Sequence, residues 1–325
     1  MKISIGIPIF GVEKYIERCA RSLFEQTYAN IEYVFVNDCT KDRSMDILFK
    51  VIEDYPNRKQ SVKVINHDKN SGSSASRNSA LDAFTGDFVM WVDSDDWLER
   101  NAVSMLVEMQ VETQCDIITF DSTWHYPQKT AVFHNEKIKF PHELLLGIFK
   151  RTNLNAIWGR FIRRELYEIH HIRCYEGINI GEDFQQITQL LYYADSVCVL
   201  NEPLYHYECS NMGSYMSSFS ENKTLQAIQS LLIVKDFLID KEENLLEEFY
   251  VYMAYSLSTF MAGAVNNNNK RCYDRIFELL RQMPDSTIHS IPLSYRMLYL
   301  VNNYRMAKYY AHIGKVLRRC NFIKK

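Results

Sequence analysis

The amino-acid sequence predicts an α/β fold in which a mostly parallel sheet is flanked by helices and followed by a helical C-terminal region. Over the first 120 residues, short apolar runs that suit strands buried on both faces alternate with segments of helical spacing. Residues 220–325 are poor in strand-like runs and indicate three or four helices. We therefore expect one domain over residues 1–215, divided near residue 120, and a helical region over residues 216–325.

The apolar runs place five strands in the first half of the chain: Ile3–Ile9, Ile31–Val36, Val62–Ile65, Phe88–Val92 and Asp116–Phe120. Residues at helical spacing lie between these runs, and one expected helix begins near Leu98. Alternating strands and helices predict a parallel sheet with right-handed crossovers.

The second half shows a looser pattern. A helix is expected over residues 184–194, opened by Gly181, Glu182 and Asp183. Two short strands are expected on either side of Glu202-Pro203, at Val197–Leu200 and Leu204–Tyr207. The C-terminal helices are expected to break near residues 266–269 and at Pro284.

The composition is that of an ordinary globular protein, with 47% apolar and 24% charged residues in a chain of 325. No apolar run approaches 18 residues, and the N-terminus has no export signal, so we expect a cytoplasmic protein. Its eight cysteines form no C-x-x-C pair, which predicts reduced, buried or idle thiols and gives no support for a zinc site.

Charge is distributed unevenly along the chain. Residues 286–325 carry eight Lys and Arg and no Asp or Glu, which leaves a formal charge of −11 on residues 1–285. The tail mixes these cations with aromatic and aliphatic residues at near-helical spacing, as in Tyr304, Arg305, Lys308 and Tyr309. It suits either a peripheral position on the anionic inner face of the cell membrane or a helix packed on the protein body. The acidic remainder argues against a nucleic-acid partner.

Three carboxylates, Asp93, Asp95 and Asp96, follow the strand expected at residues 88–92. Like charges about 4 Å apart cost about 4 kcal/mol at intermediate dielectric, and a divalent cation removes that cost. Hard oxygen ligands favour Mg²⁺ or Mn²⁺. An acidic turn that caps the next helix is the plainer alternative, but ligands of parallel sheets bind at the carboxyl ends of strands, which favours a metal site.

Other polar residues follow neighbouring strands. Asp38 suits either a hydrogen bond to a nucleoside or a capped turn, and Phe10 either stacks on a base or belongs to the core. The small, hydroxylated segment 71–78 contains Arg77 and suits the approach of a phosphate, although serines before a helix are also ordinary caps.

Two further candidates lie later in the chain. Glu182 and Asp183 open a helix, where acids are favourable in any protein, yet transfer to a hydroxyl requires a carboxylate base. His206 is either a strand histidine with satisfied hydrogen bonds or an additional metal ligand.

Five motifs occur in order: residues 8–15, 22–28 and 36–38, Ser76-Arg77-Asn78, and residues 92–96. In residues and spacing they resemble the inverting glycosyltransferases of family 2, which have the GT-A fold. The resemblance covers about the first 110 residues strongly and extends to about residue 210 through Trp158, Glu182-Asp183 and residues 202–207. Gly11 and Cys39 depart from the usual Asn and Gly.

The resemblance implies a nucleotide-sugar site, most simply for a UDP-sugar, in residues 1–120 and an acceptor half in residues 121–215. The residues that would bind the donor are Pro8, Phe10, Glu13, Asp38, Arg77, Asp93, Ser94 and Asp95. Asp93, Asp95, Asp96 and His206 would hold the divalent metal, and Asp183, with Glu182 beside it, would be the catalytic base. The acceptor would be a saccharide or lipid-linked saccharide in surface polysaccharide synthesis.

Two alternative functions remain open at this point. A nucleotidyltransferase would need a basic, Gly-rich loop after the first strand, and residues 7–11 contain no Lys or Arg. A non-catalytic nucleotide-sugar-binding subunit of a polysaccharide assembly would not need Asp93, Asp95 and Asp183.

Overall fold

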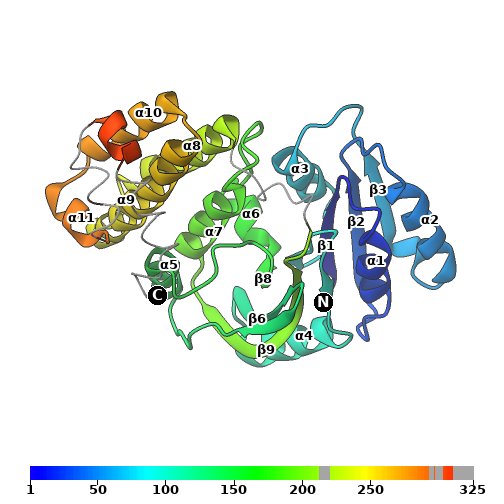
Figure 1. Ribbon diagram of the computed structural model, residues 1–325. Helices are drawn as coiled ribbons and strands as arrows, with labels where there is room; N and C mark the ends of the chain where they lie inside the picture. Colours follow the sequence, from blue (N-terminus) through cyan, green and yellow to red (C-terminus); the bar gives the residue numbers. More distant parts are fainter. Residues whose placement is uncertain (212–219, 293–295, 297–302, 310–325) are drawn as a thin grey trace. The chain divides into compact units, whose positions relative to one another are not determined.

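The computed structural model describes residues 1–211, 220–292, 296 and 303–309. The chain divides into two compact units, Met1–Tyr215 and Met216–Lys325. The N-terminal unit contains a nine-stranded sheet, and the described part of the C-terminal unit is helical (Figure 1).

The sheet has the strand order β3-β2-β1-β4-β8-β6-β9-β5, with β7 paired to β6. Its strands are β1 Ile3–Ile9, β2 Ile31–Asn37, β3 Val62–Asn66, β4 Phe88–Trp91, β5 Trp97–Leu98, β6 Ile117–Tyr126, β7 Lys129–Phe133, β8 Arg160–Arg163 and β9 Val197–Glu208. The five strands expected in the first half of the chain are present. The first four have bounds within one residue of those predicted, whereas β6 begins at Ile117 and continues to Tyr126, beyond the expected end at Phe120.

Helices pack on both faces of the first four strands. Apolar side chains of α1 (Ile16–Phe24), α2 (Ser44–Asp54) and α4 (Ala102–Thr113) join one core with the sheet. The other face carries α3 (Ser73–Ala83), which contacts β1 and β2 (Figure 1). The remaining helices of this unit are the short 3₁₀ helix Lys59–Ser61, α5 Pro141–Lys150, α6 Arg164–Ile169 and α7 Glu182–Tyr193.

The second half of the sheet is mixed rather than parallel. The first four strands pair in parallel, but β8 is antiparallel to both β4 and β6. The two short strands expected around Pro203 are one strand, β9, whose pairing with β6 shifts register at Asp121. Such an irregularity accommodates a proline, which cannot donate a ladder hydrogen bond.

The helix expected to begin near Leu98 begins at Ala102 instead. Trp97 and Leu98 form β5, which pairs with His206 and Tyr205 of β9. The partner strand lies more than 100 residues away, so no local pattern could show that these residues are extended.

The prediction that all cysteines are thiols is wrong for Cys115 and Cys198, which form a disulfide between the starts of β6 and β9. The two strands are paired neighbours, which brings the Cα atoms to 6.1 Å although 83 residues separate them. Among the described residues, the other five cysteines are free.

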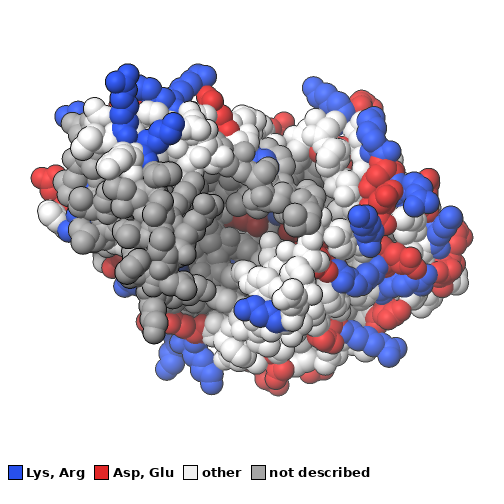
Figure 2. Space-filling model, in the orientation of Figure 1, with Lys and Arg blue, Asp and Glu red and all other residues white. Residues whose placement is uncertain are grey.

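The C-terminal unit contains α8 Glu221–Leu238, α9 Glu243–Asn266, α10 Lys270–Arg281 and α11 Asp285–Ser290. Its helices break at residues 267–269 and at Pro284, as the sequence predicts. Residues 304–309 of the basic tail are helical, and residues 310–325 lie outside the described part of the chain. No described helix is long and apolar enough to span a membrane. On the face shown in Figure 2, Lys and Arg of the N-terminal unit are interspersed with Asp and Glu, so that face carries no extended surface of one sign.

Candidate active site

Three carboxylates predicted for the site, those of Asp93, Glu182 and Asp183, lie close to one buried guanidinium. Arg77 of α3 is 3% exposed, and its Nη2 lies 2.8 Å from Asp183 Oδ1, 3.5 Å from Asp93 Oδ1 and 4.0 Å from Glu182 Oε1. These four side chains, which we call the Arg77 cluster, come from α3, the loop after β4 and the first turn of α7. The predicted approach of Asp183 to the acidic loop is therefore present in the structure.

The charges of the Arg77 cluster do not balance, because three carboxylates face one cation. Burial, reinforced by Asp183 and Asp95, raises the pKa of Asp93 to about 7 although Arg77 opposes the shift. Burial and the neighbouring Asp183 also raise the pKa of Glu182. The Asp93 side chain remains 33% exposed, so solvent reaches it. A site with this excess of negative charge favours a cation.

Asp95 is the second carboxylate of the acidic loop. Its Oδ2 accepts a hydrogen bond from Asn211 Nδ2 at 2.9 Å, and its backbone oxygen accepts one from Arg18 Nη2 at 2.9 Å. Burial raises the pKa of Asp95. Ser94, between the two aspartates, is 5% exposed.

These aspartates fit a divalent metal only in part. In the described part of the chain, no three His, Cys, Asp or Glu side chains are grouped so that they could hold an ion. Asp93 and Asp95 offer hard oxygen ligands, and a bound cation would lower their raised pKa values. The pair therefore suits a cation whose coordination a substrate phosphate completes.

Asp96 does not fit its predicted role as a metal ligand. It is fully buried, its Oδ2 accepts a hydrogen bond from the Tyr205 hydroxyl at 2.6 Å, and its Oδ1 accepts one from the Glu208 N–H at 2.8 Å. The Asp93 N–H donates to the same Tyr205 oxygen at 3.1 Å. Asp96 thus attaches the acidic loop to β9.

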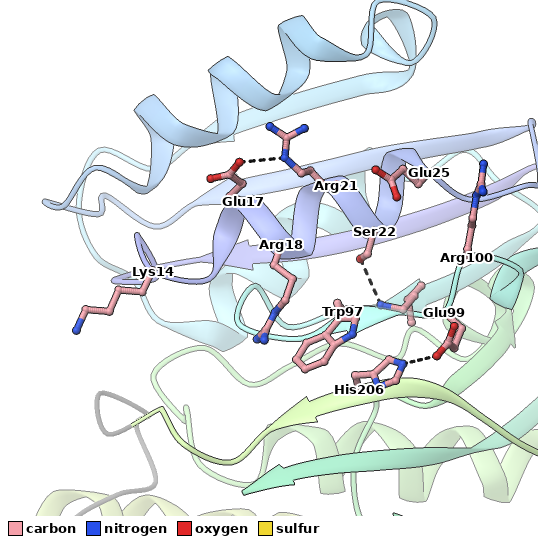
Figure 3. Close-up of a pocket in the computed structure, with 11 residues that line it drawn as sticks. Lys14, Glu17, Arg18, Arg21, Ser22, Glu25, Trp97, Glu99, Arg100 and His206 are labelled. Atoms are coloured by element: carbon pink, nitrogen blue, oxygen red, sulfur yellow. Dashed lines mark hydrogen bonds and ion pairs between the residues drawn. The ribbon is translucent and has the colours of Figure 1, made fainter. Parts of the chain in front are cut away.

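His206 lies beside a cavity of about 650 Å³ lined by residues of α1 and β5 (Figure 3). Its Nε2 is 2.8 Å from Glu99 Oε1, its Nδ1 is 3.0 Å from His125 Nε2, and its ring stacks on Trp97. Because both ring nitrogens already have protein partners, this geometry does not support the predicted metal contact.

Phe10, Glu13 and Pro8 lie at or just beyond the carboxyl end of β1. Phe10 is 54% exposed, so its ring is available for stacking, whereas Pro8 is partly buried in the strand. The Glu13 carboxylate accepts a hydrogen bond from the Arg43 N–H at 3.1 Å. Gly11 has φ +69° and an open surrounding, which supports a turn after the exposed ring.

Asp38 holds a loop and is only 3% exposed. Its Oδ1 accepts the Ser71 N–H at 2.8 Å and faces His67 Nδ1 at 2.8 Å, and its Oδ2 accepts the Gly72 N–H at 2.8 Å. Of the two interpretations left open by the sequence, these contacts are those of a capped turn.

The segment before α3 is less available to a phosphate than predicted. The Ser71 and Gly72 amides are taken by Asp38, and the Ser74 N–H donates to Asn179 Oδ1 at 3.1 Å. A Cβ at Gly72 would lie 2.2 Å from Asn179, so the two chain segments are in close contact. Three backbone N–H groups of this segment are therefore already paired within the protein.

Sequence reasoning missed the residues that support the acidic loop. Arg18 of α1 donates to Asp95, pairs with Glu208 at 2.9 Å and lies 3.5 Å over the Trp97 ring. The hydroxyl of Tyr205, on β9, donates a hydrogen bond to Asp96 and accepts one from the Asp93 N–H. Only the folded pairing of β5 with β9 brings these side chains together, so no sequence signal could have identified them.

Comparison with known proteins identifies the same family as the sequence motifs. Residues 4–172 match the model of Glycosyl transferase family 2. The chain is 32% identical over 219 residues to the uncharacterized glycosyltransferase EpsJ of Bacillus subtilis, covering 63% of this chain and 60% of EpsJ. It is 24% identical over 256 residues to the minor teichoic acid biosynthesis protein GgaB of the same species, covering 78% of this chain and 28% of GgaB. The matched region thus spans less than two thirds of either relative.

Among solved structures, S. aureus TarS 1–349 in complex with UDP-GlcNAc is similar with a TM-score of 0.76 and 20% identity. The likeness covers 98% of this chain and 92% of that chain. It confirms the predicted GT-A fold, with a mixed sheet and additional C-terminal helices.

Proposed function

Because the chain belongs to glycosyl transferase family 2, we propose that it is an inverting glycosyltransferase. In this proposal it moves a sugar from a UDP-sugar to a hydroxyl of a saccharide or lipid-linked saccharide during surface polysaccharide synthesis. The observation that carries the proposal is the Arg77 cluster, in which a carboxylate from α7 meets Arg77 and the acidic loop. The teichoic acid relative supports the class of acceptor.

The donor binds across the carboxyl ends of β1, β2 and β4. Phe10, exposed after β1, stacks on the base, with Pro8 and Glu13 beside it. Asp38 shapes this pocket by fixing residues 71–72 rather than by touching the base, because three groups already surround its oxygens.

Asp93 and Asp95 would hold Mn²⁺ or Mg²⁺ together with the donor diphosphate. The metal, when bound, supplies positive charge to the departing diphosphate. Arg77 adds a fixed, buried cation beside the same phosphates. Ser94, between the two aspartates, would line the donor site.

Asp183 acts as the general base. It accepts the proton of the acceptor hydroxyl while the hydroxyl oxygen bonds to the anomeric carbon of the sugar. The bond from that carbon to the diphosphate breaks in the same step, and the electron pair leaves with UDP. A single displacement inverts the configuration, with Glu182 next to Asp183 contributing negative charge but no separate proton step.

Incubation with a panel of nucleotide sugars, a saccharide acceptor and Mn²⁺, followed by measurement of released nucleoside diphosphate, tests this function. The proposal predicts release that EDTA abolishes and that is lost in Asp95→Ala. Asp54→Ala is the matched control, since Asp54 is an exposed α2 carboxylate paired with Arg21. Tight nucleotide-sugar binding without release, across the panel, would favour the non-catalytic subunit instead.

The basic tail remains a separate proposal. Residues 304–309 include Arg305 and Lys308 on a short helical segment, and the rest of the pattern falls in residues 310–325, which are not described. Contact with an anionic membrane would place the enzyme beside a lipid-linked acceptor. Co-sedimentation with anionic vesicles at low and high salt tests it, and absence of binding at low salt rejects it.

A further inference from the structure

Arg160, at the start of β8, is a second buried arginine near the Arg77 cluster. It is 1% exposed, and its Nη2 donates to the Leu154 carbonyl at 2.7 Å. Its Nε and Nη1 have no hydrogen-bond partner in the described part of the chain. Neither the sequence motifs nor the proposed mechanism gives this side chain a role.

Arg160 lies on the face of the sheet that carries the Arg77 cluster. Phe161, the next residue, pairs with Met90, and both side chains belong to the core on the α1 face. Side chains alternate along a strand, so Arg160 and Trp91 point to the opposite face. The Arg77 guanidinium lies 5.5 Å from the Trp91 ring on that face. Arg160 is therefore a neighbour of the cluster.

The loop before β8 connects Arg160 to the proposed base. Arg160 holds this loop at Leu154, and three residues later the Ile157 N–H donates to Asp183 Oδ2 at 3.2 Å. Arg77 holds the other oxygen, Oδ1, at 2.8 Å. The orientation of the Asp183 carboxylate thus depends on a loop that Arg160 holds through the Leu154 carbonyl.

A buried guanidinium without an ion-pair partner in contact is costly, and an apolar side chain of similar volume would be the stable choice for a core. Burial lowers the pKa of Arg160 to about 10, and the negative charge of Asp183 is the largest influence that opposes this. The electrostatic partner of Arg160 is therefore the carboxylate to which its loop is attached.

We propose that Arg160 is a positioning residue for sugar transfer. It fixes the loop 154–160, so that the Ile157 N–H holds the Asp183 carboxylate, and it places a second cation near that carboxylate. This inference rests on the proposed function, because it gives Asp183 the role of base. Arg160 itself touches neither donor nor acceptor in this account.

Steady-state kinetics of Arg160→Gln and Arg160→Lys test the proposal. Glutamine removes the charge and lysine retains it, with one donor still able to reach Leu154. We expect kcat of Arg160→Gln to fall about 100-fold, as for a catalytic group misplaced by about 1 Å, while KM for the donor changes less than about twofold. Arg160→Lys should recover at least about a tenth of the wild-type kcat.

Arg163→Gln is the matched control. Arg163 lies on the same strand and pairs with Asp116 at 2.8 Å, but its side chain is 29% exposed and touches no member of the Arg77 cluster. Its kcat should stay within about twofold of the wild type. An unchanged kcat in Arg160→Gln, or equal losses in Arg160→Gln and Arg163→Gln, overturns the inference.

Two safeguards keep the outcomes distinguishable. If Arg160→Gln does not fold, a folded Arg160→Lys with kcat below about 1% of wild type and normal donor binding overturns the inference, because charge and anchoring are both retained. If the wild type itself releases no nucleoside diphosphate with any donor, the proposed function fails before the variants are compared.

Discussion

Removing the Tyr205 hydroxyl should destabilise the N-terminal unit and loosen the acidic loop. In Tyr205→Phe, Asp96 loses a 2.6 Å hydrogen bond at a fully buried oxygen, and the Asp93 N–H loses its acceptor at 3.1 Å. A hydrogen bond to a charged group contributes about 1.5–3 kcal/mol and an ordinary one about 0.5–1.5 kcal/mol. The free energy of unfolding should therefore fall by about 2–4.5 kcal/mol.

Urea unfolding followed by tryptophan fluorescence measures this change, because all four tryptophans lie in the N-terminal unit. Tyr207→Phe is the matched control: Tyr207 is two residues along the same strand and also stacks on Trp158, but its hydroxyl makes no hydrogen bond within the described residues. Its loss should stay below about 0.5 kcal/mol. Equal effects in the two variants would refute the reasoning that Tyr205 anchors the acidic loop.

Three further changes have defined outcomes. Asp183→Asn should lower kcat about 10²- to 10⁴-fold in the nucleoside diphosphate assay, whereas UDP binding, measured by calorimetry, should stay unchanged. Weakened UDP binding with a normal kcat would contradict the role of Asp183 as base. Phe10→Ala should weaken UDP about tenfold or more without changing the urea midpoint, since Phe10 is 54% exposed; unchanged affinity would exclude base stacking. Burial would raise the pKa of Glu32, but hydrogen bonds from Lys2, Ser4 and Thr85 lower it to about 2. Its folded pKa is thus below its unfolded value, so the ionised carboxylate stabilises the fold, and Glu32→Gln should lower the free energy of unfolding by about 2–3 kcal/mol at pH 7. In urea unfolding, the difference between wild type and variant should shrink as the pH falls from about 4.5 to 2. A difference that stays constant with pH would show that the ionised carboxylate is not responsible.

The first four strands could be predicted because each is a local apolar run. β1, β2 and β4 are mostly buried, whereas β3, at the edge of the sheet, is only partly buried. The same logic fails at Trp97 and Leu98, whose extended conformation depends on β9 rather than on their neighbours. It also fails at Pro203, where two short apolar runs form one irregular strand.

The proximity of Arg77 and Asp93 could be predicted because parallel strands end at one edge of a sheet, where their loops meet. Asp183 opens α7 and follows no parallel strand, so its place beside them is expected only from the resemblance to family 2 glycosyltransferases. The different environments of the aspartates could not be predicted. Asp93 and Asp96 belong to the same motif, yet Asp93 is partly exposed and Asp96 is buried against Tyr205. That distinction depends on a hydroxyl 109 residues away, which no local pattern contains.

The most direct test of the account is a crystal structure of the protein with a UDP-sugar and Mn²⁺. The account predicts the base on Phe10, the diphosphate beside Arg77, and the metal about 2.1 Å from an oxygen of Asp93 or Asp95 and from the diphosphate. A nucleotide bound in the cavity between α1 and β5, or a diphosphate out of reach of Arg77 and Asp93, would contradict it.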